Sequence, residues 1–428
     1  MATALLGQAV VAASGILAAR ILGVEDRGIL ALLVTVALPC TLLGSLGGPT
    51  AIGYYVSSGI GDPAAMWQMG KRLLARQVVA VAAVQAVALI VLFHDQRSEA
   101  QIAAVLSIVI PSATMAQLYA MSMLQGLLEF RAFNLVRVAP PVSYAAVLVP
   151  LFVIGGGDLL LVTILWVITV VVVAIASFRV AAGRVMRASP SPHARAVSQR
   201  EVLAFGGKGL LGTANPSDGL QLDQVVIGAF LSPVQLGFYV SAVAFTNLAR
   251  FIGQSIGMVA FPAIASRPAS EHRRLVLQYV GLGALACGSV TLALELSVDT
   301  LLPLLFGEEF RPGLRFVHVL LLAGLLAGVR RTVAEAARGR GRAGAGSVAE
   351  VISWISLLIA LPILVPTSGA LGVAWSMVIA SAVSVVVLLY LALRPTTALG
   401  HDHGPPGEVA AGGESGATLT LQPRPPAT

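Results

Sequence analysis

The chain has 428 residues, of which 57% are hydrophobic and only 11% charged, and its mean hydropathy is +0.88. Soluble domains carry about 25% charged residues, so this composition excludes an ordinary soluble protein and indicates a chain buried in lipid over most of its length. The net charge of +7 does not indicate nucleic-acid binding, because the 27 Lys and Arg residues fall mainly in short connections between apolar runs.

The apolar runs are long enough to cross a membrane as helices. About 20 apolar residues span the hydrocarbon core, and this length predicts about twelve spans. Their approximate limits are 4–22, 28–57, 73–93, 101–128, 133–155, 159–180, 203–231, 235–262, 274–296, 313–337, 347–366 and 370–393. No basic segment precedes the first span and no clear cleavage site follows it, so we expect it to be retained rather than removed as a signal peptide.

The charges in the connections alternate along the chain. Connections after even-numbered spans are rich in Lys and Arg, whereas those after odd-numbered spans carry mainly acidic residues, such as Glu25, Asp26 and Glu308, and far fewer cations, one of which is Arg27. Cytoplasmic connections carry the excess of cations, so the pattern predicts that both termini are cytoplasmic.

The longest internal connection, 181–202, is basic and divides the spans into two sets of six, 1–180 and 203–394. A shift of 209 residues aligns "RILGVEDRGILALL" with "AFLSPVQLGFYVSA" and pairs Gly28 with Gly237. Because each set has an even number of spans, the repeat is parallel, with its axis along the membrane normal and a substrate site between the halves. We therefore predict an all-α integral membrane fold of two parallel-repeat bundles of six helices. The Pro- and Gly-rich segment 395–428 is predicted to be a disordered cytoplasmic tail.

The patterns of common catalytic and metal sites are missing from the sequence. It has no HExxH, Walker lysine loop, GxSxG or CxxC pattern. The stretch "GRGRAG" at 339–344 fits GxGxxG, but it lies between two membrane spans rather than between a strand and a helix. His401 and His403 have no Cys or further His near them in the sequence. The sequence therefore predicts neither an enzyme nor a cofactor or metal site.

The charges within the spans are the candidate functional residues. Arg250 lies about midway along its span, where a charge costs about 2.5 to 3.5 kcal/mol, so it is expected to face a cavity or a partner. Asn247 and Gln254, three residues before it and four after it, lie on the same helical face. These three residues are candidates for binding substrate. An internal salt bridge or a helix-packing contact is the alternative.

Two further cations are candidates for binding substrate. Lys208 lies a few residues into its span, where the side chain could also extend to the cytoplasmic interface. Arg20 lies at the outer end of the first span, where an anchor at the membrane interface or an ion pair with Glu25 or Asp26 is the alternative. Arg330 and Arg331 are interpreted instead as an intrahelical pair with Glu335.

The span 203–231 is unusually polar. Asn215 and Asp223 project within about 80° of Lys208, which makes Asn215 another candidate substrate contact. Pro216 interrupts the backbone hydrogen bonds, and Gly212 and Gly219 loosen the helix, so these three residues are predicted to form a hinge. In an ion-coupled transporter, Asp218 or Asp223 would be the ion site.

Several stretches carry a resemblance to a known family. They are "AARILGVEDRGILALL", "SLGGPTAIGYYVS", "LQLDQVVIGAFLSPVQLGFYVSAVAF", "FPAIAS", "LLFGEEFRPGLRFVHVLLLAGLL", "ARGRGRAG" and "SGALGVAWSMVIASAV". They resemble bacterial polysaccharide flippases of the O-antigen type, in the multidrug, oligosaccharidyl-lipid and polysaccharide exporter superfamily. The resemblance implies a V-shaped pair of six-helix bundles that gives alternating access to a central cavity. It also implies transfer of undecaprenyl-diphosphate-linked sugars from the inner to the outer leaflet of the bacterial cytoplasmic membrane.

Three hypotheses follow for function. The first is a lipid-linked oligosaccharide flippase for cell-surface polysaccharide, with membrane lipids and a polysaccharide polymerase or glycosyltransferases as further partners. The second is an ion-coupled antiporter of small molecules or drugs in the same superfamily. The third is a membrane scaffold for glycan enzymes that transports nothing, although this hypothesis gives no reason for Arg250 at mid-membrane.

Overall fold

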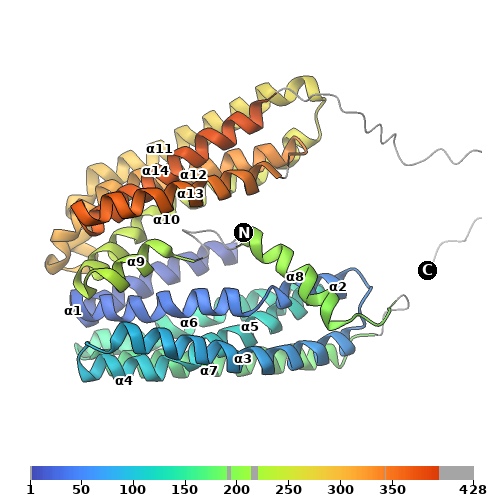
Figure 1. Ribbon diagram of the computed structural model, residues 1–428, viewed down its shortest axis with the longest axis horizontal. Coiled ribbons are helices and arrows are strands. Elements are labelled where there is room, and N and C mark those ends of the chain that lie inside the picture. Colours follow the sequence, from blue (N-terminus) through green and yellow to red (C-terminus); the bar gives the residue numbers. More distant parts are fainter. Residues whose placement is uncertain (1, 190–193, 214–219, 343, 395–428) are drawn as a thin grey trace, which may run out of the picture. The chain divides into compact units, whose positions relative to one another are not determined.

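The computed structural model describes residues 2–189, 194–213, 220–342 and 344–394, and every regular element among them is helical. The helices are α1 (Ala2–Gly44), α2 (Gly48–Ser57), α3 (Pro63–Phe93), α4 (Ser98–Ser107), α5 (Val109–Gly126), α6 (Phe130–Ile154), α7 (Leu159–Val185), α8 (Gln199–Thr213), α9 (Leu222–Phe230), α10 (Pro233–Ala265), α11 (Ala269–Phe306), the 3₁₀ helix η1 (Glu308–Gly313), α12 (Leu314–Gly339), α13 (Gly344–Ser368) and α14 (Ala370–Leu393). The predicted all-α membrane fold is confirmed (Figure 1).

Ten helical segments in the described residues are long and apolar enough to cross a membrane, compared with about twelve predicted spans. Two local features account for the difference. Helix α1 runs through the first predicted span and most of the second, and a non-helical residue, Gly23, separates them. The seventh predicted span is divided into α8 and α9, of 15 and 9 residues, each too short to cross a bilayer alone.

Gly23 reverses the direction of the chain within α1. Its φ of 72° and ψ of −177° are a conformation that essentially only glycine adopts. Residues at nearly equal distances along the chain on either side of Gly23, Ala18 with Arg27 and Val11 with Val34, line one cavity. The two halves of α1 therefore lie antiparallel, as two consecutive membrane spans should.

The helices pack in two groups, α1–α7 and α10–α14, and α1 also packs along α10 (Figure 1). Helix α8 contacts α2, and Val202 at its start is buried with Tyr55 and Trp67 of the first group. Helix α9, in contrast, packs on α1, α10 and α14. The two pieces of the seventh predicted span thus have different neighbours. The domain boundaries at 180 and 203 stay predictions.

Glycines permit the closest contacts between helices. A Cβ atom at Gly28 would lie 1.7 Å from the carbonyl oxygen of Pro233, and one at Gly237 would lie 2.1 Å from that of Val24. In a membrane, where lipid is as apolar as a side chain, such close backbone packing stabilises helix pairs. Gly28 and Gly237 are the residues that the 209-residue shift aligns, so repeat-related positions contact each other where α1 crosses α10.

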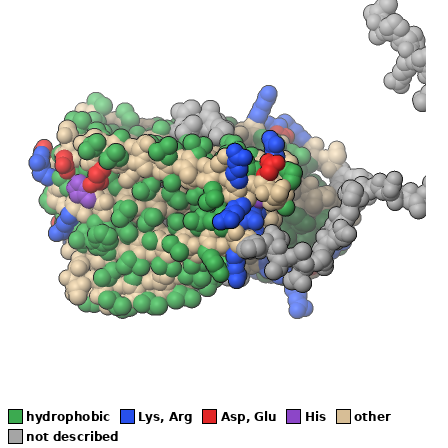
Figure 2. Space-filling model, turned by 90° about the horizontal axis from the view of Figure 1, so that it is seen from above, with side chains coloured by type: hydrophobic (Ala, Val, Ile, Leu, Met, Phe, Trp, Pro, Cys, Tyr) green, Lys and Arg blue, Asp and Glu red, His purple; other side chains and the backbone are tan. Residues whose placement is uncertain are grey.

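The surface fits a protein surrounded by lipid. Charged side chains gather toward the two ends of the molecule, and the surface between them is largely apolar or uncharged (Figure 2). On α11, Leu285, Leu292 and Leu296 are 69%, 60% and 80% exposed. Large exposed apolar surfaces of this kind mark contact with lipid or with another protein.

Candidate functional site

The candidate site is built on α10, the 33-residue helix that carries Arg250 near its middle. One side of α10 packs closely on α12, because a Cβ atom at Gly253 would lie 2.0 Å from the carbonyl oxygen of Gly328. Asn247 and Gln254 are exposed on a neighbouring side of α10, and Arg250 is partly exposed. The three residues predicted to share one helical face do lie near the middle of one continuous helix.

Asp223 of α9 lies close enough to Arg250 for their charges to interact. Asp223 is buried, and its Oδ2 accepts a hydrogen bond of 2.9 Å from the Tyr239 hydroxyl of α10. The structure thus brings together Arg250, predicted as a substrate contact, and Asp223, predicted as an ion site. Burial disfavours the negative charge of this carboxyl group, and the Tyr239 hydroxyl and the Arg250 guanidinium offset part of that cost.

Gln224 connects this cluster to the first helix group. Its Oε1 accepts a hydrogen bond of 3.3 Å from the Thr35 hydroxyl of α1, and both side chains are buried. A layer of buried polar groups therefore crosses from α1 to α9 and α10. Thr35 and Gln224 were not among the predicted site residues, although each is a polar residue in an otherwise apolar stretch.

Gln254 has a partner that the sequence did not predict. Its Oε1 accepts a hydrogen bond of 2.9 Å from Nη1 of Arg331 on α12. The expected pairing of Arg330 and Arg331 with Glu335 is wrong for Arg330, which lies 2.5 Å from Glu350 of α13. Glu335 pairs with Arg338 at 2.7 Å instead.

Lys208 is exposed on α8. Nearby on the same helix, Phe205 stacks on Tyr54 of α2 with 4.4 Å between ring centroids. A Cβ atom at Gly206 would lie 2.5 Å from the carbonyl oxygen of Gly47. These contacts fix this part of α8 against α2 rather than against α10.

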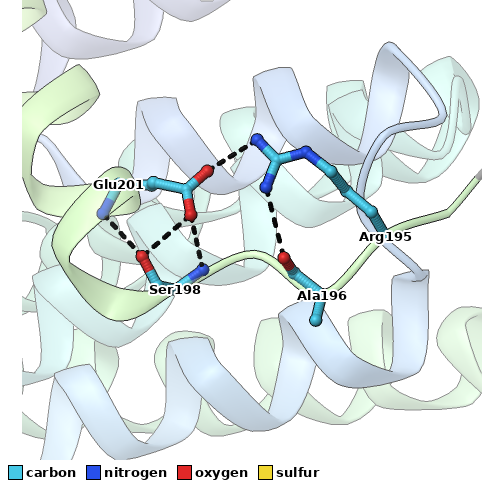
Figure 3. A network of polar contacts seen from close by, with 4 residues as sticks. All are labelled: Arg195, Ala196, Ser198 and Glu201. Atoms are coloured by element: carbon cyan, nitrogen blue, oxygen red, sulfur yellow. Dashed lines mark hydrogen bonds and ion pairs between the residues drawn. The ribbon is translucent and has the colours of Figure 1, made fainter.

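The start of α8 is held by a capping box (Figure 3). The Ser198 hydroxyl accepts from the Glu201 backbone N–H at 3.2 Å, and Glu201 Oε1 accepts from the Ser198 backbone N–H at 3.2 Å. Glu201 Oε2 also accepts from Arg195 Nη2 at 2.6 Å. Hydrogen bonds from Arg195 first, and then from Ser198, lower the pKa of Glu201 to about 2. The backbone N–H of Arg195 donates to the Ile60 carbonyl at 2.8 Å, which ties this segment to the first helix group.

Arg20 lies at the other end of the molecule from the capping box. Its Nε donates to the Leu305 carbonyl at 2.9 Å, and its Nη2 donates to the Leu304 carbonyl. These carbonyls belong to the last turn of α11, where they have no partner within the helix. The alternative pairing of Arg20 with Asp26 is wrong, because Asp26 pairs with Arg97. Arg20 thus links the first half of α1 to α11, and its contact with substrate stays a prediction.

The remaining predicted residues lie in or beside the break between α8 and α9. Asn215, Pro216, Asp218 and Gly219 lie outside the described residues. Gly212 lies in the last turn of α8. The hinge, the Asn215 contact and the Asp218 ion site therefore stay predictions.

Arg27 was predicted to lie among the charges of an outer connection, and no functional role was predicted for it. In the structure Arg27 belongs to α1 and lines a cavity of ≈190 Å³ together with Tyr144 of α6 and Trp166 of α7. The only signal in the sequence is that Arg27 directly precedes the long apolar run 28–57. Among the described residues, no group of three His, Cys, Asp or Glu side chains could hold a metal ion.

Comparisons with known proteins fit this architecture. Residues 16–313 match the family model of polysaccharide biosynthesis proteins. No curated protein matches the sequence.

Solved structures with a similar fold are membrane transport proteins. The lipid II flippase MurJ in an inward closed conformation matches with a TM-score of 0.72 at 12% identity, over 91% of this chain and 86% of that chain. An inward-facing multidrug resistance MATE family transporter of the MOP superfamily matches with a TM-score of 0.68 at 16% identity, over 90% and 93% of the two chains. The predicted exporter fold is therefore confirmed.

Proposed function

The chain belongs to the polysaccharide biosynthesis protein family, and from this premise we propose that it is a flippase. It moves a polyprenyl-diphosphate-linked oligosaccharide from the inner to the outer leaflet of the bacterial cytoplasmic membrane, by alternating access, for cell-surface polysaccharide. A fold shared with a lipid flippase and a drug transporter supports transport rather than catalysis. Support for cytoplasmic termini comes from the basic connections after the even-numbered spans.

The observation that carries this proposal is the position of Arg250 near the middle of α10, with Asn247 and Gln254 exposed close by. A guanidinium binds phosphate oxygens through two parallel hydrogen bonds, so Arg250 suits the diphosphate of a lipid carrier. Amide side chains both donate and accept, so Asn247 and Gln254 suit sugar hydroxyls. Lys208, Asn215 and Arg20 are proposed as further contacts along the path.

One set of contacts between the helix groups supplies a gate for this mechanism. There, Gly28 packs on α10 and Arg20 binds the last turn of α11. At the other end, Gly47 packs on α8 and Tyr54 stacks on Phe205, so α8 is held on the first helix group. Alternating access requires the contacts of the gate to separate. A hinge at Gly212, Pro216 and Gly219 would let α8 move with α2 while α9 stays with α10.

The test measures flipping of a lipid-linked oligosaccharide into the outer leaflet of vesicles that contain the purified protein. Arg250→Ala should lower the rate about 10- to 100-fold, because it removes a charge-assisted contact to the diphosphate. Arg273→Ala is the matched control, since Arg273 is an exposed cation at the start of α11. A wild-type rate for Arg250→Ala would remove this residue from the site. In cells, loss of the protein should make lipid-linked repeat units accumulate on the cytoplasmic leaflet, and normal turnover of these lipids would contradict the proposal.

One observation favours a second candidate, the ion-coupled antiporter. Asp223 is buried, and its Oδ1 has no hydrogen-bond partner among the described residues. A proton or a small cation would satisfy this oxygen. In this case an ion gradient should drive efflux of an amphipathic drug from vesicles, and Asp223→Asn should abolish that coupling. A scaffold for a polysaccharide polymerase or glycosyltransferases would show neither activity.

A further inference from the structure

A cavity inside the first helix group contains an arginine for which the described residues supply no counter-ion. The cavity, of ≈190 Å³, lies between the two halves of α1 and the helices α6 and α7. Arg27, Tyr144 and Trp166 line it, together with mainly apolar side chains. It is separate from the polar cluster of α9 and α10 described above.

Arg27 has no partner among the described residues. Its Nε is buried and makes no hydrogen bond. None of the described residues that line the cavity carries a carboxylate. Asp26, next to Arg27 in the chain, is paired with Arg97. A charged side chain within a membrane protein is expensive unless a partner offsets its charge, so this arrangement is complete only with an anion in place.

The other polar groups of the cavity also favour an anion. The Tyr144 hydroxyl and the Trp166 indole N–H can donate hydrogen bonds, and both side chains line the cavity beside Arg27. Ser14 donates its own hydroxyl hydrogen to the Val10 carbonyl at 2.8 Å, within its helix. The cavity therefore offers a guanidinium and two further donors, which is the pattern that oxyanions require.

The size and depth of the cavity limit the ligand. Sites for drug-sized molecules are about 300 to 1,000 Å³, so this smaller space holds one anionic group rather than a whole oligosaccharide. Arg27 follows the Gly23 break by four residues, which places it about 6 Å along the helix from the end of the molecule. At this depth an anionic group can enter from the interface without crossing the membrane centre.

We infer that this cavity is a binding site for a single phosphate or carboxylate group, held by the Arg27 guanidinium with Tyr144 and Trp166 as further donors. The group is carried on a lipid or is free in solution, because the same chemistry recognises both. The inference does not depend on the proposed transport activity.

The test uses Trp166 as a reporter of its own cavity. Trp67, Trp354 and Trp375 are the other tryptophans of the chain, and changing them to Phe leaves Trp166 as the single fluorophore. The full-length protein is placed in phosphatidylcholine nanodiscs and titrated with iodide, an anionic quencher, and with acrylamide, a neutral one. Iodide should quench Trp166 with saturation, whereas acrylamide should quench it without saturation.

Substitution of Arg27 identifies the group that holds the anion. Arg27→Gln should weaken the saturable iodide effect about tenfold or more and leave acrylamide quenching unchanged, whereas Arg27→Lys should retain most of the effect. Two competitors distinguish the source of the ligand. Displacement of iodide by inorganic phosphate indicates a free anion, and loss of the iodide effect in phosphatidylglycerol nanodiscs indicates a lipid.

Non-saturating iodide quenching of the unsubstituted site, insensitive to both competitors, would overturn the inference. This outcome is measured with Arg27 present and so does not depend on the folding of a variant. Equal iodide quenching curves for the protein that keeps Arg27 and for a folded Arg27→Gln variant would overturn the inference as well. Tyr144→Phe, which keeps the charge and removes one donor, should weaken iodide binding less than Arg27→Gln.

Discussion

A methyl group at Gly28 tests whether the contact between α1 and α10 holds one end of the two helix groups together. In Gly28→Ala the new Cβ atom would lie 1.7 Å from the Pro233 carbonyl oxygen, with backbone atoms on both sides of the clash. Restoring ordinary contact needs the helices to separate by about 1.5 Å or more. Overpacking of this kind costs about 1 to 3 kcal/mol.

This cost applies only to the state in which α1 and α10 are in contact. A difference of about 1 to 3 kcal/mol shifts an equilibrium between two conformations by about 5- to 150-fold. Gly28→Ala should therefore populate a state in which this end is open. Gly288→Ala is the matched control, because no atom lies within 4 Å of its Cβ position on α11.

Spin labels at Ile154 and Phe230 report the opening by pulsed electron resonance. These residues are 79% and 76% exposed at the ends of α6 and α9, one associated with each helix group. The two natural cysteines, Cys40 and Cys287, are first replaced by serine. We expect a longer mean distance between the labels for Gly28→Ala and an unchanged one for Gly288→Ala. Identical distance distributions and unfolding temperatures for Gly28→Ala and the parent protein would refute the reasoning.

Three further outcomes test other contacts. Tyr119→Phe removes the 2.8 Å hydrogen bond to Gln77 Oε1 and leaves that buried acceptor without a donor. The free energy of unfolding should therefore fall by about 1 to 3 kcal/mol. An unchanged free energy of unfolding in denaturant titrations would contradict this. Glu350→Gln leaves the mostly buried Arg330 without its counter-charge. A double-mutant cycle at Arg330 and Glu350, measured by thermal unfolding, should show strong coupling between the two substitutions. Additive effects on stability would rule out the ion pair. The pKa of Glu201 is lowered from its ordinary value of 4.5 to about 2, so its contribution to stability is complete above pH 4.5 and is lost as the pH falls toward 2. The difference in unfolding temperature between the parent protein and Glu201→Gln should shrink over this interval, and a difference independent of pH would contradict the role of the capping box.

Much of the fold could be predicted from the sequence because membrane spans are set by local composition. A run of about 20 apolar residues has to form a helix in lipid, since each backbone polar group must be satisfied within the segment. The same local pattern marked Arg250 as a charge in the middle of a span and linked Gly28 to Gly237 through the repeat. The structure then placed these two glycines in contact, which the alignment alone did not require.

The errors concern partners that lie far apart in the chain. Arg330 was paired with a neighbour on its own helix, but it forms an ion pair with Glu350 of the next helix. Arg20 was compared with Asp26 nearby, but it binds carbonyl groups of α11, some 285 residues away in the chain. Helical periodicity describes only contacts within one helix, so it cannot rank a distant partner against a near one.

The sequence by itself determined the all-helical membrane class of the protein, the approximate limits of most of its long apolar helices and the position of a cation, Arg250, near the middle of one of them. These follow from the cost of placing polar groups in lipid, which each segment bears on its own. Only the tertiary structure decided that α8 contacts α2 while α9 contacts α10, and that Arg27 lines a cavity with Tyr144 and Trp166 and has no partner within the described part of the chain. Such features depend on which helices pack together, because a side chain is paired or unpaired only once its neighbours from other helices are in place.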